Sequence, residues 1–131
     1  MQIIVAFSVD KALALTEQQE WVLTDSFGKT PLAAPEALLG LLPLLEMDYD
    51  SFLDKLQQHH IPEPVVDAFP LLPLLQYPFE NQRKFWAEDA MRWLLAINDP
   101  QALSAWAQTI TTDWMPQKLK HDFRGFFRIG K

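Results

Sequence analysis

The amino-acid sequence predicts a mainly α-helical protein with a small β element near its N-terminus. Three observations support this: a helical period of apolar residues over 78–117, a leucine-rich stretch with frequent prolines over 30–77, and a run of β-branched and aromatic residues at Gln2–Val9. We expect about five to six helices, arranged as a compact bundle or a short helical-repeat-like array. The alternative is an α+β fold, because the first thirty residues could hold more than one strand.

The composition is that of an ordinary globular domain. The chain has 131 residues, of which 49% are hydrophobic and 21% are charged, and a chain of this length can bury a core without covalent staples. It contains no cysteine, which excludes disulfides, thiolate metal sites and cysteine nucleophiles. We predict one domain over 1–131 with four successive parts: a small β element at 1–29, short helices at 30–77, a helical hairpin at 78–117 and a basic, aromatic tail at 118–131.

The first thirty residues are predicted to form strands. Gln2–Val9 is apolar on both faces, so it should be a buried strand. The next segment has two interpretations. Thr16 and Gln19 match a capping box that would begin a helix, whereas 20–24 followed by 25–29 is typical of a strand and a turn. We favour the strand, because it would supply hydrogen-bond partners for the first one.

The segment 30–77 is predicted to contain only short helices, because eight prolines from Pro31 to Pro78 limit their length. We expect helices over 35–42, from an N-cap at Asp50 to about His59, and from Pro64 toward Phe69. An irregular apolar connection over 70–78 should follow. The letters Leu-Leu-Pro-Leu-Leu occur at 41–45 and again at 71–75. They indicate either two degenerate repeat units or, as we favour, two apolar connectors of similar composition.

Residues 78–117 carry the clearest helical pattern. Apolar residues recur at helical spacing on both sides of Asn98-Asp99-Pro100. Asp99 is a suitable N-cap and Pro100 a suitable first helical residue, so we predict a very short loop between two antiparallel helices. Four of the five tryptophans lie in this hairpin: Trp86, Trp93, Trp106 and Trp114.

Charge is distributed unevenly along the chain. Residues 1–117 hold 6 basic and 16 acidic side chains, whereas residues 118–131 hold 5 basic and 1 acidic. An acidic body repels phosphate groups and favours basic partners, so nucleic acid could contact only the tail. The candidate contacts are Lys118, Lys120, Arg124 and Arg128.

The tail is also rich in phenylalanine. Gly125 should interrupt any helix there, and the aromatic side chains should be covered by other parts of the protein. We favour phenylalanines in the core, with the cations against the protein's own acidic surface or that of a second copy in a homo-oligomer. Stacking of the phenylalanines on nucleic-acid bases is the alternative.

Motifs for metal binding and catalysis are incomplete. Two groups have ligand-like spacing: His59, His60, Glu63 and Asp67, and Asp48, Asp50 and Asp54. Prolines break the helix that would align the first group, and the second lacks the glycine and glutamate of a calcium loop. The sequence has no serine-nucleophile motif and no phosphate-binding glycine loop. We therefore expect no metal, no cofactor and no enzymatic activity, with Asp89 as the best acid–base candidate if it is buried.

No stretch free of charged residues reaches the length of about 18 residues that a membrane span needs. Met1–Val9 lacks the basic start of a secretory signal, and Asp10 interrupts its apolar run. We expect a cytoplasmic protein that does not enter the membrane.

The leading hypothesis for function is a small acidic protein that binds another protein stoichiometrically. An inhibitor, an immunity-type protein or a dedicated chaperone would act in this way. Aromatic residues dominate the energetics of protein interfaces, so an exposed one should mark the binding surface. The candidates are Trp86 and Trp114, followed by Trp21.

Two further hypotheses come from other functional classes. One is a small-molecule binder or enzyme with a pocket lined by Trp86, Trp93 and Trp106, with Asp89 as its polar group. The other is nucleic-acid contact through the basic tail, which predicts an affinity that falls steeply with added salt.

Overall fold

The computed structural model describes residues 1–129, and 54% of them lie in helices. The chain divides into two compact units, which we call unit 1 (residues 1–74) and unit 2 (residues 75 onward). Unit 1 contains a four-stranded antiparallel sheet, so the fold mixes helices and strands as in the α+β alternative. No helix in the described range is both long and apolar enough to span a bilayer. The prediction of a single domain over 1–131 stays a prediction.

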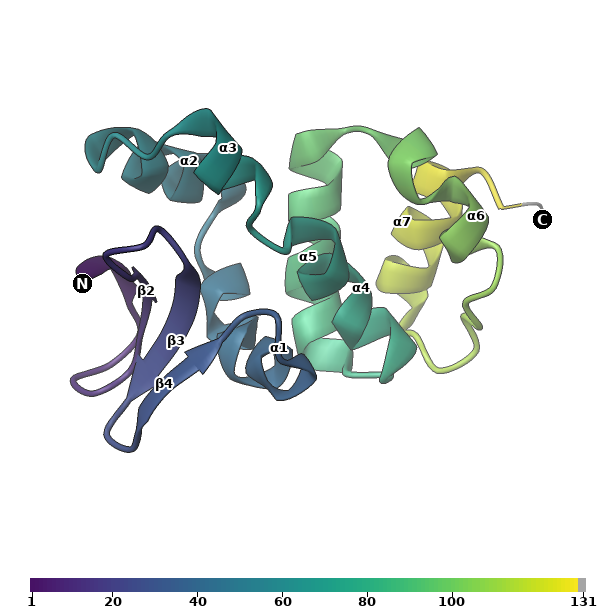
Figure 1. Ribbon diagram of the computed structural model, residues 1–131. Coiled ribbons are helices and arrows are strands. Elements are labelled where there is room, and N and C mark those ends of the chain that lie inside the picture. The colour runs from purple at the N-terminus through teal and green to yellow at the C-terminus, as the bar shows by residue number, and fades with distance from the viewer. Residues whose placement is uncertain (130–131) are drawn as a thin grey trace. The chain divides into compact units, whose positions relative to one another are not determined.

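The sheet is formed by strands that pair in sequence order (Figure 1). The strands are β1 (Gln2–Ala6), β2 (Ala12–Leu15), β3 (Trp21–Asp25) and β4 (Gly28–Pro31). The strands expected at 2–9 and 20–24 are confirmed as β1 and β3, with shorter or shifted bounds. The sequence did not predict β2 and β4. Alanine and leucine in β2 are good helix formers, but all its residues are buried and paired on both sides, so tertiary pairing overrides local propensity.

Trp21 fixes the sheet against helices of unit 1. Its ring packs edge-to-face on Phe69 with 5.2 Å between centroids, and Phe52 packs on the same Phe69 ring at 5.2 Å. The indole Nε1–H of Trp21 donates to the carbonyl of Val65 at 2.8 Å. This hydrogen bond satisfies the one polar atom of a side chain that is only 6% exposed.

The helices of unit 1 lie close to their expected positions. They are α1 (Pro35–Leu41), the 3₁₀ helix η1 (Leu42–Glu46), α2 (Tyr49–Gln58) and α3 (Glu63–Asp67). The N-cap of α2 is Asp48 and not Asp50. The first Leu-Leu-Pro-Leu-Leu segment lies across the end of α1 and in η1, whereas the second lies inside an α-helix. The two copies therefore have different conformations and do not form a structural repeat.

The irregular connection expected over 70–78 is wrong, because this segment belongs to helix α4 (Leu71–Glu80). Pro73 stands in the first turn, where its missing N–H would have had no intrahelical partner. Pro78 lies inside the helix and removes one backbone hydrogen bond near its C-terminal end. Burial of Leu75 and Phe79 offsets this loss.

The predicted hairpin is present in part. Its first helix is α5 (Lys84–Ile97), which ends where Asn98 adopts a left-handed conformation with φ of 56°. After the short connection, only η2 (Pro100–Leu103) and α6 (Ser104–Ala107) follow, so the long second helix is wrong. Residues 109–112 are all β-branched and disfavour a helix. The hydroxyl of Thr109 also donates to the carbonyl of Trp106 at 2.6 Å, in competition with helical hydrogen bonds.

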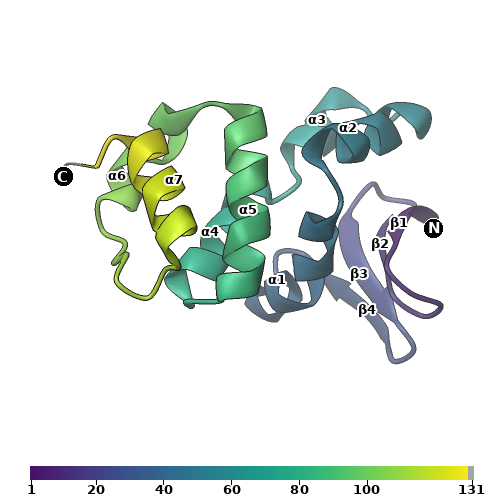
Figure 2. The ribbon, with the colours of Figure 1, turned by 180° about the vertical axis from the view of Figure 1, so that it is seen from behind.

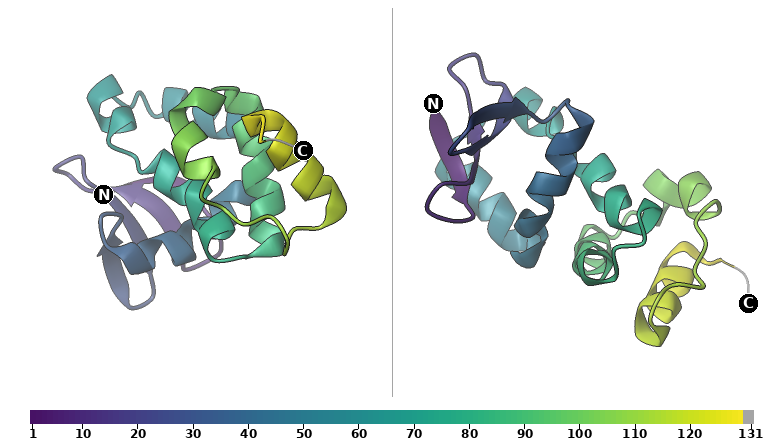
Figure 3. Two further views of the ribbon diagram at one scale, coloured as in Figure 1. Left: turned by 90° about the vertical axis from the view of Figure 1, so that its right-hand side faces the viewer. Right: turned by 90° about the horizontal axis from the view of Figure 1, so that it is seen from below.

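The basic tail forms helix α7 (Gln117–Phe127) and is not interrupted at Gly125. A glycine inside a helix costs about 1 kcal/mol relative to alanine. Burial of Leu119, Phe123 and Phe127 on one side of α7 offsets this cost. Figure 2 and both views of Figure 3 show α7 packed beside the other helices of unit 2.

The core of unit 2 includes four rings that we call the aromatic cluster: Phe79, Trp106, Phe123 and Phe127. Phe123 lies 5.0 Å from Phe79 and 4.9 Å from Phe127 between ring centroids. The indole N–H of Trp106 donates to a carboxylate oxygen of Glu80 at 2.9 Å. Two of the three phenylalanines of the tail, Phe123 and Phe127, are thus core residues and cannot stack on bases, whereas Phe126 is half-buried.

Candidate functional site

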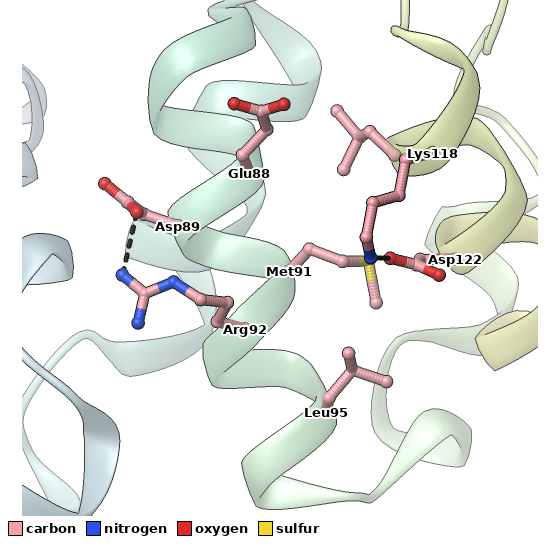
Figure 4. A pocket seen from close by; sticks show the side chains of 8 residues that line it. Glu88, Asp89, Met91, Arg92, Leu95, Lys118 and Asp122 are labelled. Carbon is pink, nitrogen blue, oxygen red and sulfur yellow. Dashed lines mark hydrogen bonds and ion pairs between the residues drawn. The ribbon is translucent and has the colours of Figure 1, made fainter.

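A groove of about 360 Å³ lies between α5 and α7 of unit 2. The two helices are neighbours in the chain's contact pattern and in Figure 2. The groove is lined from α5 by Glu88, Asp89, Met91, Arg92 and Leu95, and from α7 by Lys118, Leu119 and Asp122. In Figure 4, Met91 extends from α5 toward Lys118 and Asp122 of α7, and Asp89 and Arg92 pair with each other on the side of α5 away from α7. The facing side chains therefore combine an apolar centre with charged ends.

One ion pair crosses the α7 side of this groove. The ammonium group of Lys118 donates to a carboxylate oxygen of Asp122 at 2.9 Å. This hydrogen bond and the charge of Asp122 raise the pKa of Lys118 above its ordinary value of 10.5, and the charge of Glu88 adds to the effect. The associated stabilisation is present below pH 10.5 and is lost as the pH rises through the raised pKa. At neutral pH, Lys118 is positively charged, and the carboxylate of Asp122 neutralises this charge.

Glu88 is the groove carboxylate that no ion pair of the described residues neutralises. Asp122 is paired with Lys118, and Asp89 Oδ1 accepts a hydrogen bond from the Arg92 guanidinium at 2.8 Å. Glu88 is exposed, one helical turn from Met91 and Arg92. The groove thus presents a negative charge beside apolar side chains.

Exposed apolar residues lie on α5 beside the groove. Leu95 is 49% exposed and lines the groove itself, and Phe85 is 62% exposed. Phe85 packs edge-to-face on Trp86 with 4.8 Å between centroids. Phe85, Glu88, Arg92 and Leu95 follow at spacings that place them along one side of a helix. This side of α5 leaves apolar area in water at both ends.

The tryptophans expected at a partner surface have different environments. Trp21 is buried in unit 1, where its hydrogen bond to Val65 gives it a structural role. Trp86 is half-buried against Phe85. Trp114 is also half-buried, with its indole N–H donated to the carbonyl of Thr111 at 2.7 Å.

The residues expected to line a tryptophan pocket are not brought together at the groove. Asp89 lines it, but Trp93 and Trp106 do not. Trp93 is fully buried, and Trp106 is half-buried in the aromatic cluster. The second carboxylate oxygen of Asp89 is buried and has no hydrogen-bond partner among the described residues.

The structure separates the four tail cations into two groups. Lys118 lines the groove and pairs with Asp122. Lys120, Arg124 and Arg128 instead line a shallow hollow on another side of α7, together with His121 and Gly125. The sequence treated these cations as one set because it did not place them on the sides of a helix.

Over residues 1–129, the structure contains no cluster of three or more histidine and carboxylate side chains that could hold a metal ion. His59, one of the histidines with ligand-like spacing, instead accepts a hydrogen bond at Nδ1 from the side-chain amide of Gln2, at 3.0 Å.

Comparisons with family models, curated proteins and solved structures find no match to this chain. The groove must therefore be interpreted from its own chemistry.

Sequence reasoning missed Phe85, Met91, Leu95 and Leu119 as site residues. Phe85 lies on the opposite side of α5 from the buried residues of this helix. Leu95 is likewise apolar but off the buried stripe. A search for apolar residues outside the buried stripe would have found both.

Proposed function

We propose that the protein is a binding module for another protein, and that the partner docks on the exposed side of α5 that carries Phe85 and Leu95, beside the groove. The observation that carries this proposal is the exposure of Phe85 and Leu95 on that side, with the groove beside them. Exposed apolar side chains that flank a concave, partly charged surface are typical of protein-interaction sites. The proposed location is the cytoplasm.

The groove would hold an anchor of the partner. Its volume of about 360 Å³ fits one or two side chains, whereas a stable interface buries about 800 Å² on each protein. Apolar contact with Leu95, which is 49% exposed, would supply the central burial. The exposed aromatic pair Phe85–Trp86 would extend the interface along α5, since aromatic residues contribute strongly to binding energy.

The charges of the site favour a basic partner segment. Glu88 is the groove carboxylate without an ion pair, so a lysine or arginine of the partner would complement it. Unit 1 strengthens this preference over a longer range, because it holds 3 basic and 11 acidic residues. We therefore propose a partner with a basic, amphipathic helix or loop.

The test is affinity capture with the tagged full chain in extract of the native source. Leu95→Asp and Phe85→Asp each place a charge on the proposed surface. Phe27→Asp is the matched control, because Phe27 is 97% exposed in the β3–β4 turn of unit 1. We expect one stoichiometric protein that is retained by the wild-type chain and by Phe27→Asp, and lost by the two α5 variants.

Glu88→Lys tests the charge preference, and it should weaken capture while Glu36→Lys in α1 leaves it unchanged. Retention of the same protein by all variants, or its loss in Phe27→Asp as well, would refute this surface. Capture of no protein at low salt would refute the module itself.

A further inference from the structure

The polar side of α7 carries a row of basic side chains that the proposed function does not use. Lys120 and Arg124 lie one turn apart on α7. Arg128 is the residue that ends the helix, where its backbone is left-handed with φ of 54°. All three line a hollow of about 500 Å³, to which His121 and Gly125 also contribute. We call these three cations the basic row.

The basic row is not neutralised within the described part of the chain. No carboxylate lines the hollow, and no ion pair joins any of the three cations to a residue of the range 1–129. The Nε of Arg124 is buried and has no hydrogen-bond acceptor among these residues. Three cations without an internal counter-charge around one hollow favour an anion there.

Gly125 keeps the centre of the hollow open. A Cβ at this position would have no heavy atom within 4 Å, so an anion can approach the helix backbone between the flanking side chains. Glycine commonly stands where a ligand comes close to the main chain.

We propose that the basic row binds the phosphate backbone of double-stranded nucleic acid, with no stacking on bases. Single-strand binders rely on exposed aromatic platforms, whereas Phe123 and Phe127 are buried in the aromatic cluster and the half-buried Phe126 packs on Phe127. An acidic protein partner would require apolar anchors at the centre of its interface, and the centre of this hollow is Gly125. A membrane would require the apolar side of α7, which is already used in the core.

The net charge of the whole chain, −6, does not describe this surface. Unit 1 holds 3 basic and 11 acidic residues, whereas unit 2 holds 8 basic and 6 acidic. The acidic unit weakens the attraction at low salt, so we expect non-specific binding with a dissociation constant of roughly 10⁻⁴ to 10⁻⁶ M.

The test is fluorescence anisotropy of a labelled mixed-sequence 20-base-pair DNA duplex, titrated with the full chain from low to moderate salt. Three phosphate contacts predict a log–log salt slope of roughly −2.7, or about a 40-fold loss of affinity between 50 and 200 mM salt. The double variant Lys120→Gln/Arg124→Gln removes two cations and should reduce the slope to roughly −1.

The matched control is Lys29→Gln/Lys84→Gln, which changes the net charge equally but lies outside both the hollow and the groove. Its slope should remain that of the wild-type chain. Gly125→Glu is a second variant that places a carboxylate in the open centre of the hollow, where its Cβ meets no neighbour. It should reduce the affinity for the duplex at least tenfold at low salt, without loss of helical circular dichroism.

Several results would overturn the proposal. One is the absence of an anisotropy change at 20 mM salt. The others are equal losses of duplex affinity in the test and control variants, and tighter binding of the matching single strand than of the duplex. Equal or tighter binding of phosphatidylserine vesicles would assign the row to a membrane, and equal or tighter binding of polyglutamate would assign it to an acidic protein.

Discussion

Replacing Phe123 with alanine should remove the central ring of the aromatic cluster. Phe123 is fully buried, and its ring lies 5.0 Å from Phe79, 4.9 Å from Phe127 and 6.2 Å from Trp106. Truncation of a buried phenylalanine costs about 3 to 5 kcal/mol, and each lost ring pair can add about 0.5 to 1.5 kcal/mol to simple burial. Because three pairs are lost, we expect a decrease near the upper limit, about 4 to 5 kcal/mol, in the free energy of unfolding.

Phe126→Ala is the matched control, because it has the same chemistry in the same helix. Phe126 is half-buried and has one ring neighbour, Phe127, at 4.9 Å, so its truncation should cost about 1 kcal/mol. The assay is urea denaturation followed by tryptophan emission. Four of the five tryptophans lie in unit 2, so the signal reports mainly on that unit. Equal losses in the two variants, or a loss below about 1 kcal/mol in Phe123→Ala, would refute the assignment of the α7 core.

Three further predictions concern two glycines and the groove ion pair. Gly125→Ala should stabilise the protein by about 0.5 to 1 kcal/mol in the same urea assay, because alanine is the better helix former and its Cβ meets no neighbour. Gly40→Ala should instead destabilise the protein by about 1 kcal/mol, because the added Cβ would overlap the buried Leu23 side chain. The free-energy cost of repacking Leu23 exceeds the gain in helix propensity from alanine. Unchanged stability would contradict the packing of α1 on β3. In an NMR titration, the pKa of Lys118 should lie above 10.5 in the wild-type chain and return toward 10.5 in Asp122→Asn, and equal values in both proteins would refute the pair.

The sequence predicted best where local pattern and tertiary packing agree. Apolar residues at helical spacing located α5, and Asn98 and Pro100 marked the connection that follows it. Rules based on local conformation gave wrong predictions where the free energy of burial outweighs the intrinsic helix propensity of a residue. Gly125 and Pro78 both lie inside helices because the aromatic side chains beside them are buried. The net free energy of packing, which decides these cases, is not visible in a short window of sequence.

The strands missed by the sequence have a similar explanation. β2 has the composition of a helix, and its neighbours in the sheet give it both of its hydrogen-bonding edges. β4 contains Gly28 and Pro31, which are depleted in strands, but it is an edge strand, where such residues are tolerated. Pairing between successive strands of the sheet therefore determined what the propensity of each segment could not.

The candidate groove could be predicted only in part. Asp89 and Lys118 were recognised as candidate site residues, but the groove also requires α5 and α7 to lie beside each other. Because a break was expected at Gly125, the sequence did not predict helix α7. The charged residues of the tail could therefore not be assigned to different sides of a helix. Phe85 and Leu95 were visible as apolar residues outside the buried stripe, and this is the local signal that most directly indicates an unpartnered surface.

Site-specific photo-crosslinking tests the central claim, that a partner protein docks on α5 beside the groove, most directly. A benzoylphenylalanine residue is placed at position 95 of the full chain, and in a second preparation at position 27. Both positions are exposed, but only Leu95 lines the groove. After irradiation in extract of the native source, we predict one discrete protein adduct from position 95 and none from position 27. No adduct from position 95, or the same adduct from both positions, would contradict the proposed docking surface.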